Sequence, residues 1–235
     1  MEDRLIEYIK SVLENIPNGW LNLTTHRLDI YDESKAKTQF LDELENLYSN
    51  SKALPSELNE LPTAYDYIRL GHPLSCLLEW GVAKSNGLNS ENVISFSSKI
   101  APVMAILRKN LLDKKNTKIF YTGDSPDSFD SEVLKEIYGY QFELKQVNDV
   151  SSIVKENSSN ILISQPKEIC SFELSSNIDF YVNTSSQLGS ILAVNGKENE
   201  SYISEIQHVR RRETIAMTPA NCLIVLNRIT NSSLA

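Results

Sequence analysis

Tyr67 and Arg69 are the residues whose types and spacing point most directly to chemistry. They lie two apart, just before the Gly-x-Pro turn that begins at Gly71, and an apolar run that predicts a helix follows at 74–84. A guanidinium offers a planar fork of donors that suits a phosphate or carboxylate, and a phenol adds one more hydrogen bond. The pair therefore predicts an anion clamp. The simpler interpretation, which we slightly favour, is that both side chains serve only in packing and surface contacts.

A second candidate anion site is formed by Ser97 and Ser98. They separate a short predicted strand at 93–96 from a predicted helix at 101–112. Backbone N–H groups and the helix dipole favour an anion at such a turn. N-capping of the helix by either serine explains the same pattern, and for this turn taken alone we favour capping.

The sequence indicates no metal site and no nucleophilic triad. The three histidines, His26, His72 and His208, lie far apart without metal-ligand spacing. The turns lack a Gly-x-Gly-x-x-Gly or P-loop motif, and the chain has only 8 glycines. We expect no bound metal ion and assign no catalytic residue.

Charge and cysteine usage narrow the classes of partner. The net charge of −8 argues against general nucleic-acid binding. The one basic cluster, at 208–213, predicts the solvated end of a helix. No apolar run is long enough to cross a membrane, and the acidic start is unlike a secretory signal. Three widely spaced cysteines indicate reduced thiols, so we expect a cytoplasmic protein.

The first quarter of the sequence predicts a helical arm over 1–61. An apolar stripe predicts a helix over 1–16, ended by Asn18 and Gly19. A second helix is expected over 32–50, with Phe40, Leu41, Leu44 and Leu47 on one face, and a polar linker follows.

The remainder, 62–235, alternates helices and strands. Strands are expected at 93–96, 118–122, 142–147, 160–164, 178–183 and 190–196, with helices at 74–84, 101–112, 127–139, 149–157, 199–216 and 218–230. We expect Asp127 or Ser128 to cap the 127–139 helix and Thr218 with Pro219 to open the last one. Such alternation predicts a three-layer α/β/α sandwich with a mostly parallel sheet.

The order of motifs resembles the cystathionine γ-synthase-like family of Cys/Met-metabolism enzymes, which carry pyridoxal phosphate (PLP) on the aspartate-aminotransferase type of fold. Its Tyr-x-Arg-x-Gly-Asn-Pro-Thr motif is similar to the run from Tyr67 to Leu74, and Leu78-Glu79 follows as in the family. Phe96-Ser97-Ser98 stands where the family has its phosphate turn, and Thr218-Pro219 where it has a Ser-Pro helix start. The resemblance covers about 62–229 and implies a reduced PLP-transferase-like large domain.

The sequence departs from this family at the residues that would hold PLP. Gln187 stands at the position of the Schiff-base lysine, and an amide cannot form an imine. Lys99 replaces the glycine of the phosphate turn, and Asp124 lies in a turn that offers no stacking ring. The strand whose aspartate would pair with the pyridine nitrogen is missing between Pro166 and Asp179, and the chain stops where the family's small C-terminal domain begins.

These departures favour a non-catalytic homologue that acts as a partner or regulatory subunit, with itself or with a paralogous PLP enzyme subunit. In the family the Tyr-x-Arg pair holds the phosphate of a neighbouring subunit, so the resemblance implies that Tyr67 and Arg69 act in trans and Ser97 and Ser98 in cis. We expect no cofactor. The alternative is an active enzyme or small-molecule binder using the old cofactor pocket, including a PLP-dependent lyase or transferase if Gln187 is misaligned.

Overall fold

The computed structural model describes residues 3–21, 33–62, 71–126, 129–213 and 215–231. Tyr67 and Arg69 lie outside these ranges, as does the region of Asp127 and Ser128. The α-helices are α1 (Asp3–Glu14), α2 (Asn18–Leu21), α3 (Glu33–Ser49), α4 (Pro55–Asn59), α5 (Pro73–Ser85), α6 (Ala101–Leu112), α7 (Ser131–Glu136), α8 (Ile203–Glu213) and α9 (Pro219–Asn231). The strands are β1 (Val93–Phe96), β2 (Thr117–Tyr121), β3 (Glu143–Gln146), β4 (Ser159–Ser164), β5 (Phe180–Ser185) and β6 (Gly189–Val194).

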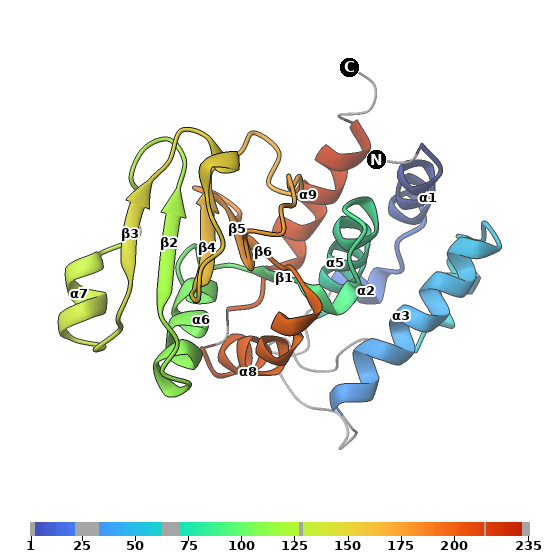
Figure 1. Cartoon of the computed structure of the whole chain (residues 1–235). Coiled ribbons are helices and arrows are strands. Elements are labelled where there is room, and N and C mark those ends of the chain that lie inside the picture. The colour runs from blue at the N-terminus through green and yellow to red at the C-terminus, as the bar shows by residue number, and fades with distance from the viewer. Residues whose placement is uncertain (1–2, 22–32, 63–70, 127–128, 214, 232–235) are drawn as a thin grey trace.

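The six strands form one sheet in the order β1-β6-β5-β4-β2-β3 (Figure 1). Pairings β4–β5, β2–β4 and β2–β3 are parallel, whereas β6 runs antiparallel to both of its neighbours. The mostly parallel sheet expected from the alternating pattern is confirmed. β6 reverses because a tight hairpin joins it to β5, and antiparallel strands need only a short connection.

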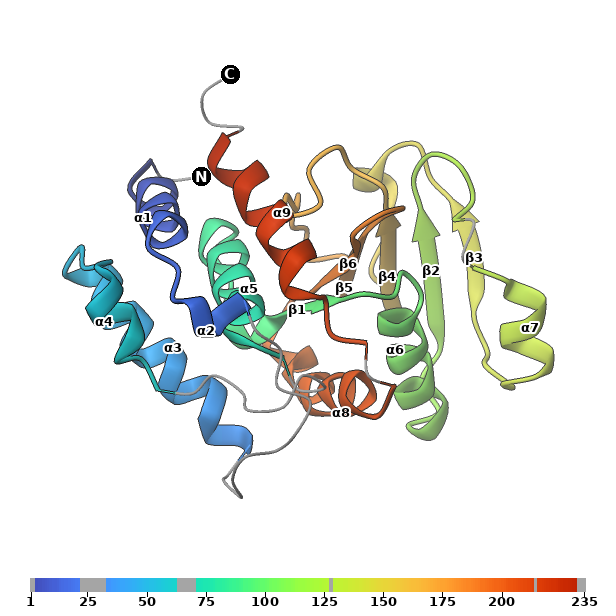
Figure 2. The same ribbon diagram turned by 180° about the vertical axis from the view of Figure 1, so that it is seen from behind.

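Alternate residues of the strands face opposite layers, as the period of two of a β-strand requires. Ile94, Ile119, Ile161 and Leu192 point towards α6 and α8, with which they share one core cluster. On the other face, α5 and α9 cover β1 and β6 (Figure 2).

Irregular segments, rather than a helix, cover this second face over β2, β4 and β5. Phe120, Leu162 and Tyr181 pack there against Ile153 and Ile178.

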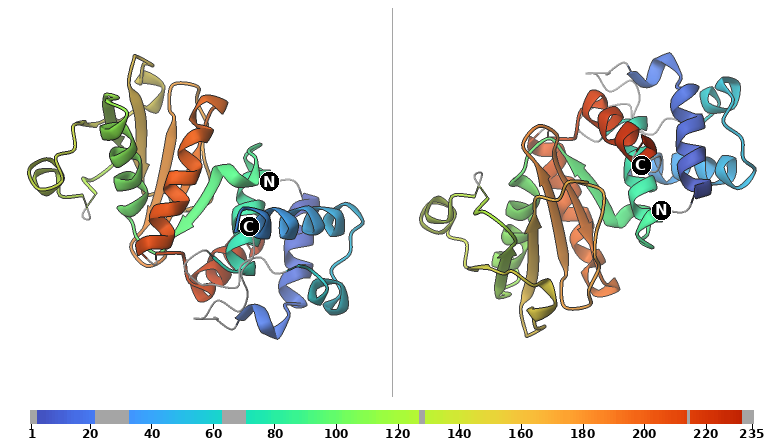
Figure 3. Two further views of the ribbon diagram at one scale, coloured as in Figure 1. Left: turned by 90° about the horizontal axis from the view of Figure 1, so that it is seen from below. Right: turned by 90° about the horizontal axis from the view of Figure 1, so that it is seen from above.

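The arm predicted over 1–61 folds back onto the body of the same chain. Figure 3 shows α1, α3 and α4 gathered on the side of α5 and α9 that faces away from the sheet. Leu5, Ile9, Phe40 and Leu44 are buried there in the core cluster that contains α5 and α9. Arg4 of α1 ties this helix to α3 by donating to the carbonyl oxygens of Tyr48 and Ser49, each at 3.1 Å.

Several helix ends follow from side chains that compete for backbone groups. Thr218 Oγ1 accepts from Asn221 N at 3.2 Å, which confirms the predicted start of α9. The cap predicted for α7 at Asp127 or Ser128 is wrong, because Asp130 accepts from Glu132 N and Val133 N and the helix starts at Ser131.

The helix predicted over 149–157 is also wrong. This segment forms only a 3₁₀ turn at Val150–Ser152. Asp149 bonds both the backbone N and the Oγ of Ser151, at 2.8 and 2.7 Å. Such local bonds favour a turn over a helix, and Ile153 then packs beneath the sheet. Within the described ranges, none of the helices has both the length and the apolar character needed to cross a membrane.

Candidate functional site

The turn after β1 and the hairpin between β5 and β6 meet where the parallel strands of the sheet have their carboxyl ends. We call this end of the sheet the candidate edge. Gly189 opens β6 with φ +92°, and a Cβ added there would lie 2.1 Å from Phe96 O. Ser190 Oγ donates to Ser98 O at 2.6 Å. The structure therefore brings Ser97, Ser98 and Gln187 to the same edge, where ligands bind in open α/β sheets. Gly189 and Ser190 were not singled out from the sequence, although a glycine directly after a strand-ending turn is a signal for close backbone approach.

Ser98 binds the backbone at the start of α6, although the N-cap residue of this helix is Ile100. The Oγ of Ser98 accepts from Ile100 N at 3.3 Å and from Ala101 N at 3.2 Å. Pro102 has no N–H to offer, and Ser97 N donates to Ile215 O at 2.9 Å. Several backbone donors that could hold an anion at this helix start thus already have partners or are missing.

Gln187 lies at the exposed tip of the hairpin, in the turn that joins Ser185 to Gly189. Its backbone N donates to Ser185 Oγ at 3.4 Å. A carboxamide in water can donate and accept hydrogen bonds, but it cannot act as a nucleophile or form an imine.

The connection between β4 and β5 contains neither helix nor strand over 165–179, and the two strands pair directly. Asn183 holds this connection, because its Nδ2 donates to Ile169 O at 3.1 Å and to Ser171 O at 2.7 Å. Thr184 Oγ1 donates to Ser164 O at 3.2 Å and fixes the end of β4. The hydroxyl and amide groups in the last part of β5 thus hold backbone in place.

A buried ionic cluster lies behind the candidate edge. Glu79 Oε1 accepts from Arg210 Nη1 at 2.6 Å and from Ser95 N and Oγ, and its Oε2 accepts from Lys37 Nζ at 2.8 Å. Burial by itself would raise the pKa of Glu79, but the charges of Lys37 and Arg210 lower it to about 2. Glu79, the glutamate of the Leu-Glu motif, therefore links the arm, α5, β1 and α8.

This cluster corrects the interpretation of the basic run at 208–213. Arg211 and Arg212 are exposed, but Arg210 is fully buried against Glu79. The run is therefore not simply a solvated helix end.

His72 caps α5 and is held neutral. Ser75 N donates to His72 Nδ1 at 3.1 Å, so the ring proton lies on Nε2, which is 2.8 Å from Met217 O. Burial is the main cause that lowers the pKa of His72 to about 4. His72 thus ties the start of α5 to the segment before α9, as a structural residue.

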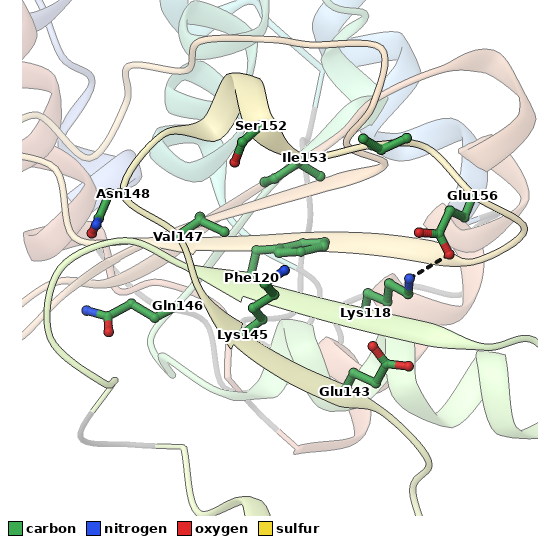
Figure 4. Close-up of a pocket in the computed structure, with 11 residues that line it drawn as sticks. Lys118, Phe120, Glu143, Lys145, Gln146, Val147, Asn148, Ser152, Ile153 and Glu156 are labelled. Carbon is green, nitrogen blue, oxygen red and sulfur yellow. Dashed lines mark hydrogen bonds and ion pairs between the residues drawn. The ribbon is translucent and has the colours of Figure 1, made fainter.

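Two hollows on the surface could receive a ligand or a partner. A groove of about 440 Å³ runs between α6, α8 and the 138–140 segment, and its lining includes Ser98, Arg108 and Tyr138. A second hollow of about 340 Å³ lies on the sheet face beside β3, with Phe120, Lys145 and Ile153 in its wall (Figure 4). In the described parts of the chain, no group of three His, Cys, Asp or Glu side chains could hold a metal ion.

Comparison with solved structures identifies the fold. Cystathionine γ-lyase from yeast aligns over 100% of this chain and 64% of its own length, with 15% identity and a TM-score of 0.60. Cystathionine γ-lyase from Lactobacillus plantarum, solved in complex with L-serine, aligns over 97% and 64%, with 10% identity and a TM-score of 0.53. The chain thus has the PLP-transferase-like α/β fold and spans less than two thirds of these two enzymes. No protein-family profile and no curated protein matches its sequence.

Proposed function

We propose that the chain is a non-catalytic homologue of PLP-dependent Cys/Met-metabolism enzymes that acts as a partner or regulatory subunit. The observation that carries this proposal is Gln187 at the exposed tip of the β5–β6 hairpin. The resemblance assigns this position to the Schiff-base lysine. Gly189 and Ser190 fix the hairpin against the Ser97–Ser98 turn, which supports the assignment.

The described residues at this edge do not fit a covalently held PLP, so no reaction step through it is derived. Ser98 Oγ already accepts the two backbone N–H groups beside it. β4 pairs with β5 directly, which leaves no strand between them to carry an aspartate for the pyridine nitrogen. Both observations agree with the loss of the lysine.

The partner role rests on apolar exposure and on the Tyr-x-Arg pair. Leu112, Ile137 and Val154 are 67, 74 and 66% exposed, and exposed apolar surface often marks an interface. In the proposed assembly, Arg69 with Tyr67 contributes to an anion site at a subunit boundary and serves the cofactor of a competent neighbour.

Borohydride trapping tests the loss of catalysis. The native chain is incubated with excess PLP, reduced and weighed intact, with a PLP lyase as the positive control. We expect no stoichiometric pyridoxyl adduct. One pyridoxyl group per chain on a single lysine would overturn the proposal.

A second candidate function is reversible binding of a small molecule. The 440 Å³ groove that reaches Ser98 favours it, because ligand pockets typically begin at about 300 Å³. Equilibrium dialysis of the native chain against PLP, without reduction, tests this candidate; saturable binding that Arg108→Ala or Met104→Arg weakens would support it.

A further inference from the structure

β3 is an edge strand that has an unpaired side. It follows β2 in the sheet order, and no described strand lies beyond it (Figures 1 and 2). Val147 N donates to Tyr121 O at 2.9 Å, so the odd-numbered residues of this strand turn their backbone groups towards β2. Because direction alternates along a strand, Leu144 and Gln146 turn theirs outward. Among the described residues, neither has a hydrogen-bond partner on that side.

The side chains of β3 form a symmetrical pattern. Glu143 and Lys145 are exposed and stand on the sheet face that carries Phe120, while Leu144 packs on the opposite face. Figure 4 shows both charged side chains along the outer strand of the hollow. Charges on an edge strand normally discourage pairing. Here, however, the two charges are opposite and are centred on an apolar residue.

We propose that two copies of the chain pair antiparallel through β3, about a twofold axis at Leu144. In this register, the two Leu144 residues exchange both of their backbone hydrogen bonds, as a hydrogen-bonded antiparallel pair does. Glu143 of each copy then lies directly opposite Lys145 of the other. The outward N–H of Gln146 faces Phe142 of the second copy, and the two sheets become one.

The flank of the strand supplies apolar surface for the same contact. Helix α7 is the outermost element on the β3 side of the sheet (Figure 3). It carries Val133, and Ile137 and Tyr138 follow it, at 37, 74 and 50% exposure. Self-pairing would cover part of this surface, because a twofold contact uses the same patch on both subunits.

The test uses charge reversal in the full-length chain. Lys145→Glu leaves two carboxylates on β3 and Glu143→Lys leaves two ammonium groups, so each variant faces itself with like charges. We expect wild type to sediment as a dimer, at twice 26.6 kDa. For each single variant, the Kd of dimer dissociation should be about tenfold higher than for wild type, or more. Lys10→Glu, an equal charge change on the exposed side of α1, is the control and should leave the dimer intact.

Mixing the two variants separates a specific pair from a general charge effect. In the mixture, positions 143 and 145 are both acidic in one chain and both basic in the other. Opposite charges then face each other again, so a heterodimer should form at near wild-type affinity. Gln146→Pro should abolish the dimer and retain the fold, since proline is tolerated where an edge N–H faces outward. Circular dichroism checks the fold of every variant.

The proposal fails if wild type stays a monomer up to millimolar concentration. It also fails if a dimer forms whose affinity is unchanged by both charge reversals. It fails as well if mixing the two variants does not restore dimerisation. It does not depend on the loss of PLP chemistry, because β3 contributes none of Ser97, Ser98 and Gln187. Failure here and a pyridoxyl adduct in the trapping experiment are therefore distinguishable results.

Discussion

Lys37 Nζ lies 2.8 Å from Glu79 Oε2, and both side chains are almost fully excluded from water, at 3 and 0% exposure. The contact joins the N-terminal arm to the helix that opens the α/β body. Because Arg210 binds the other oxygen of Glu79, one carboxylate organises two buried cations. Arm and body are thus joined by charge as well as by apolar packing.

Replacing Glu79 by Gln should destabilise the chain by about 3–5 kcal/mol, because it leaves buried cations without their carboxylate. Urea unfolding followed by circular dichroism measures this. Glu156→Gln is the matched control: Glu156 pairs with Lys118 at 2.6 Å but is 59% exposed, so its loss should cost about 1 kcal/mol or less. Adding Lys37→Met to Glu79→Gln should recover part of the loss. Equal effects of the two Gln variants would contradict this account.

His72 should make stability fall between about pH 6.5 and pH 4. Its pKa is lowered to about 4 in the folded chain from an ordinary 6.5, so in this window the unfolded state binds a proton that the folded state does not. Stability is therefore fully present above pH 6.5 and is lost as pH falls, by roughly 3 kcal/mol in total.

His72→Asn retains a capping side chain and removes the titration. The difference in unfolding free energy between pH 7 and pH 5 should therefore shrink in this variant. An unchanged difference would place the titrating group elsewhere.

How much of this could be predicted from the sequence depends on the range of the interactions. The ranges predicted for the 101–112 helix and for the strands agree well with the structure, because these elements follow from local hydrophobic periodicity. The helix over 149–157 failed because Asp149 bonds Ser151, a competition that propensity does not show. The burial of Arg210 depends on Glu79, 131 residues away, which no local pattern reveals. At the candidate edge, the N-cap predicted at Ser97 or Ser98 falls instead at Ile100, and the contact of Gly189 with the Ser97 turn was not anticipated.

Gly189→Ala should be strongly destabilising, by about 3 kcal/mol, since a left-handed φ costs about 1–2 kcal/mol and a clash with backbone adds to it. The added Cβ would meet Phe96 O at 2.1 Å. Gly87→Ala is the control, because Gly87 also has a positive φ, of +68°, but nothing lies within 4 Å of its Cβ position. Thermal unfolding of the two variants should separate the clash from the conformational cost. Similar losses of stability in the two variants would mean that the hairpin shifts at little cost to make room for the added Cβ.

Gln187→Lys should not by itself create a PLP enzyme. The side chain is exposed, so the substitution should change the free energy of unfolding by no more than about 0.5 kcal/mol. An exposed lysine stays protonated at neutral pH, whereas imine formation needs the neutral amine. After PLP treatment and reduction, peptide mapping should show no more label at position 187 than at the exposed Lys10. Selective, stoichiometric label at 187 would show that a PLP pocket survives around that single position.

The three free cysteines are all buried, so the rate at which each thiol is labelled reports how often the structure around it opens. Burial raises the pKa of Cys76 to about 12 and that of Cys170 to about 11, and raises that of Cys222 as well. A thiol reagent attacks the thiolate, so modification must wait for exposure. Cys76 and Cys222 lie in the core under the arm, and Cys170 in the β4–β5 connection. Following the labelling of each thiol over time by mass spectrometry would therefore give separate opening rates for the core under the arm and for the β4–β5 connection. No added probe is needed.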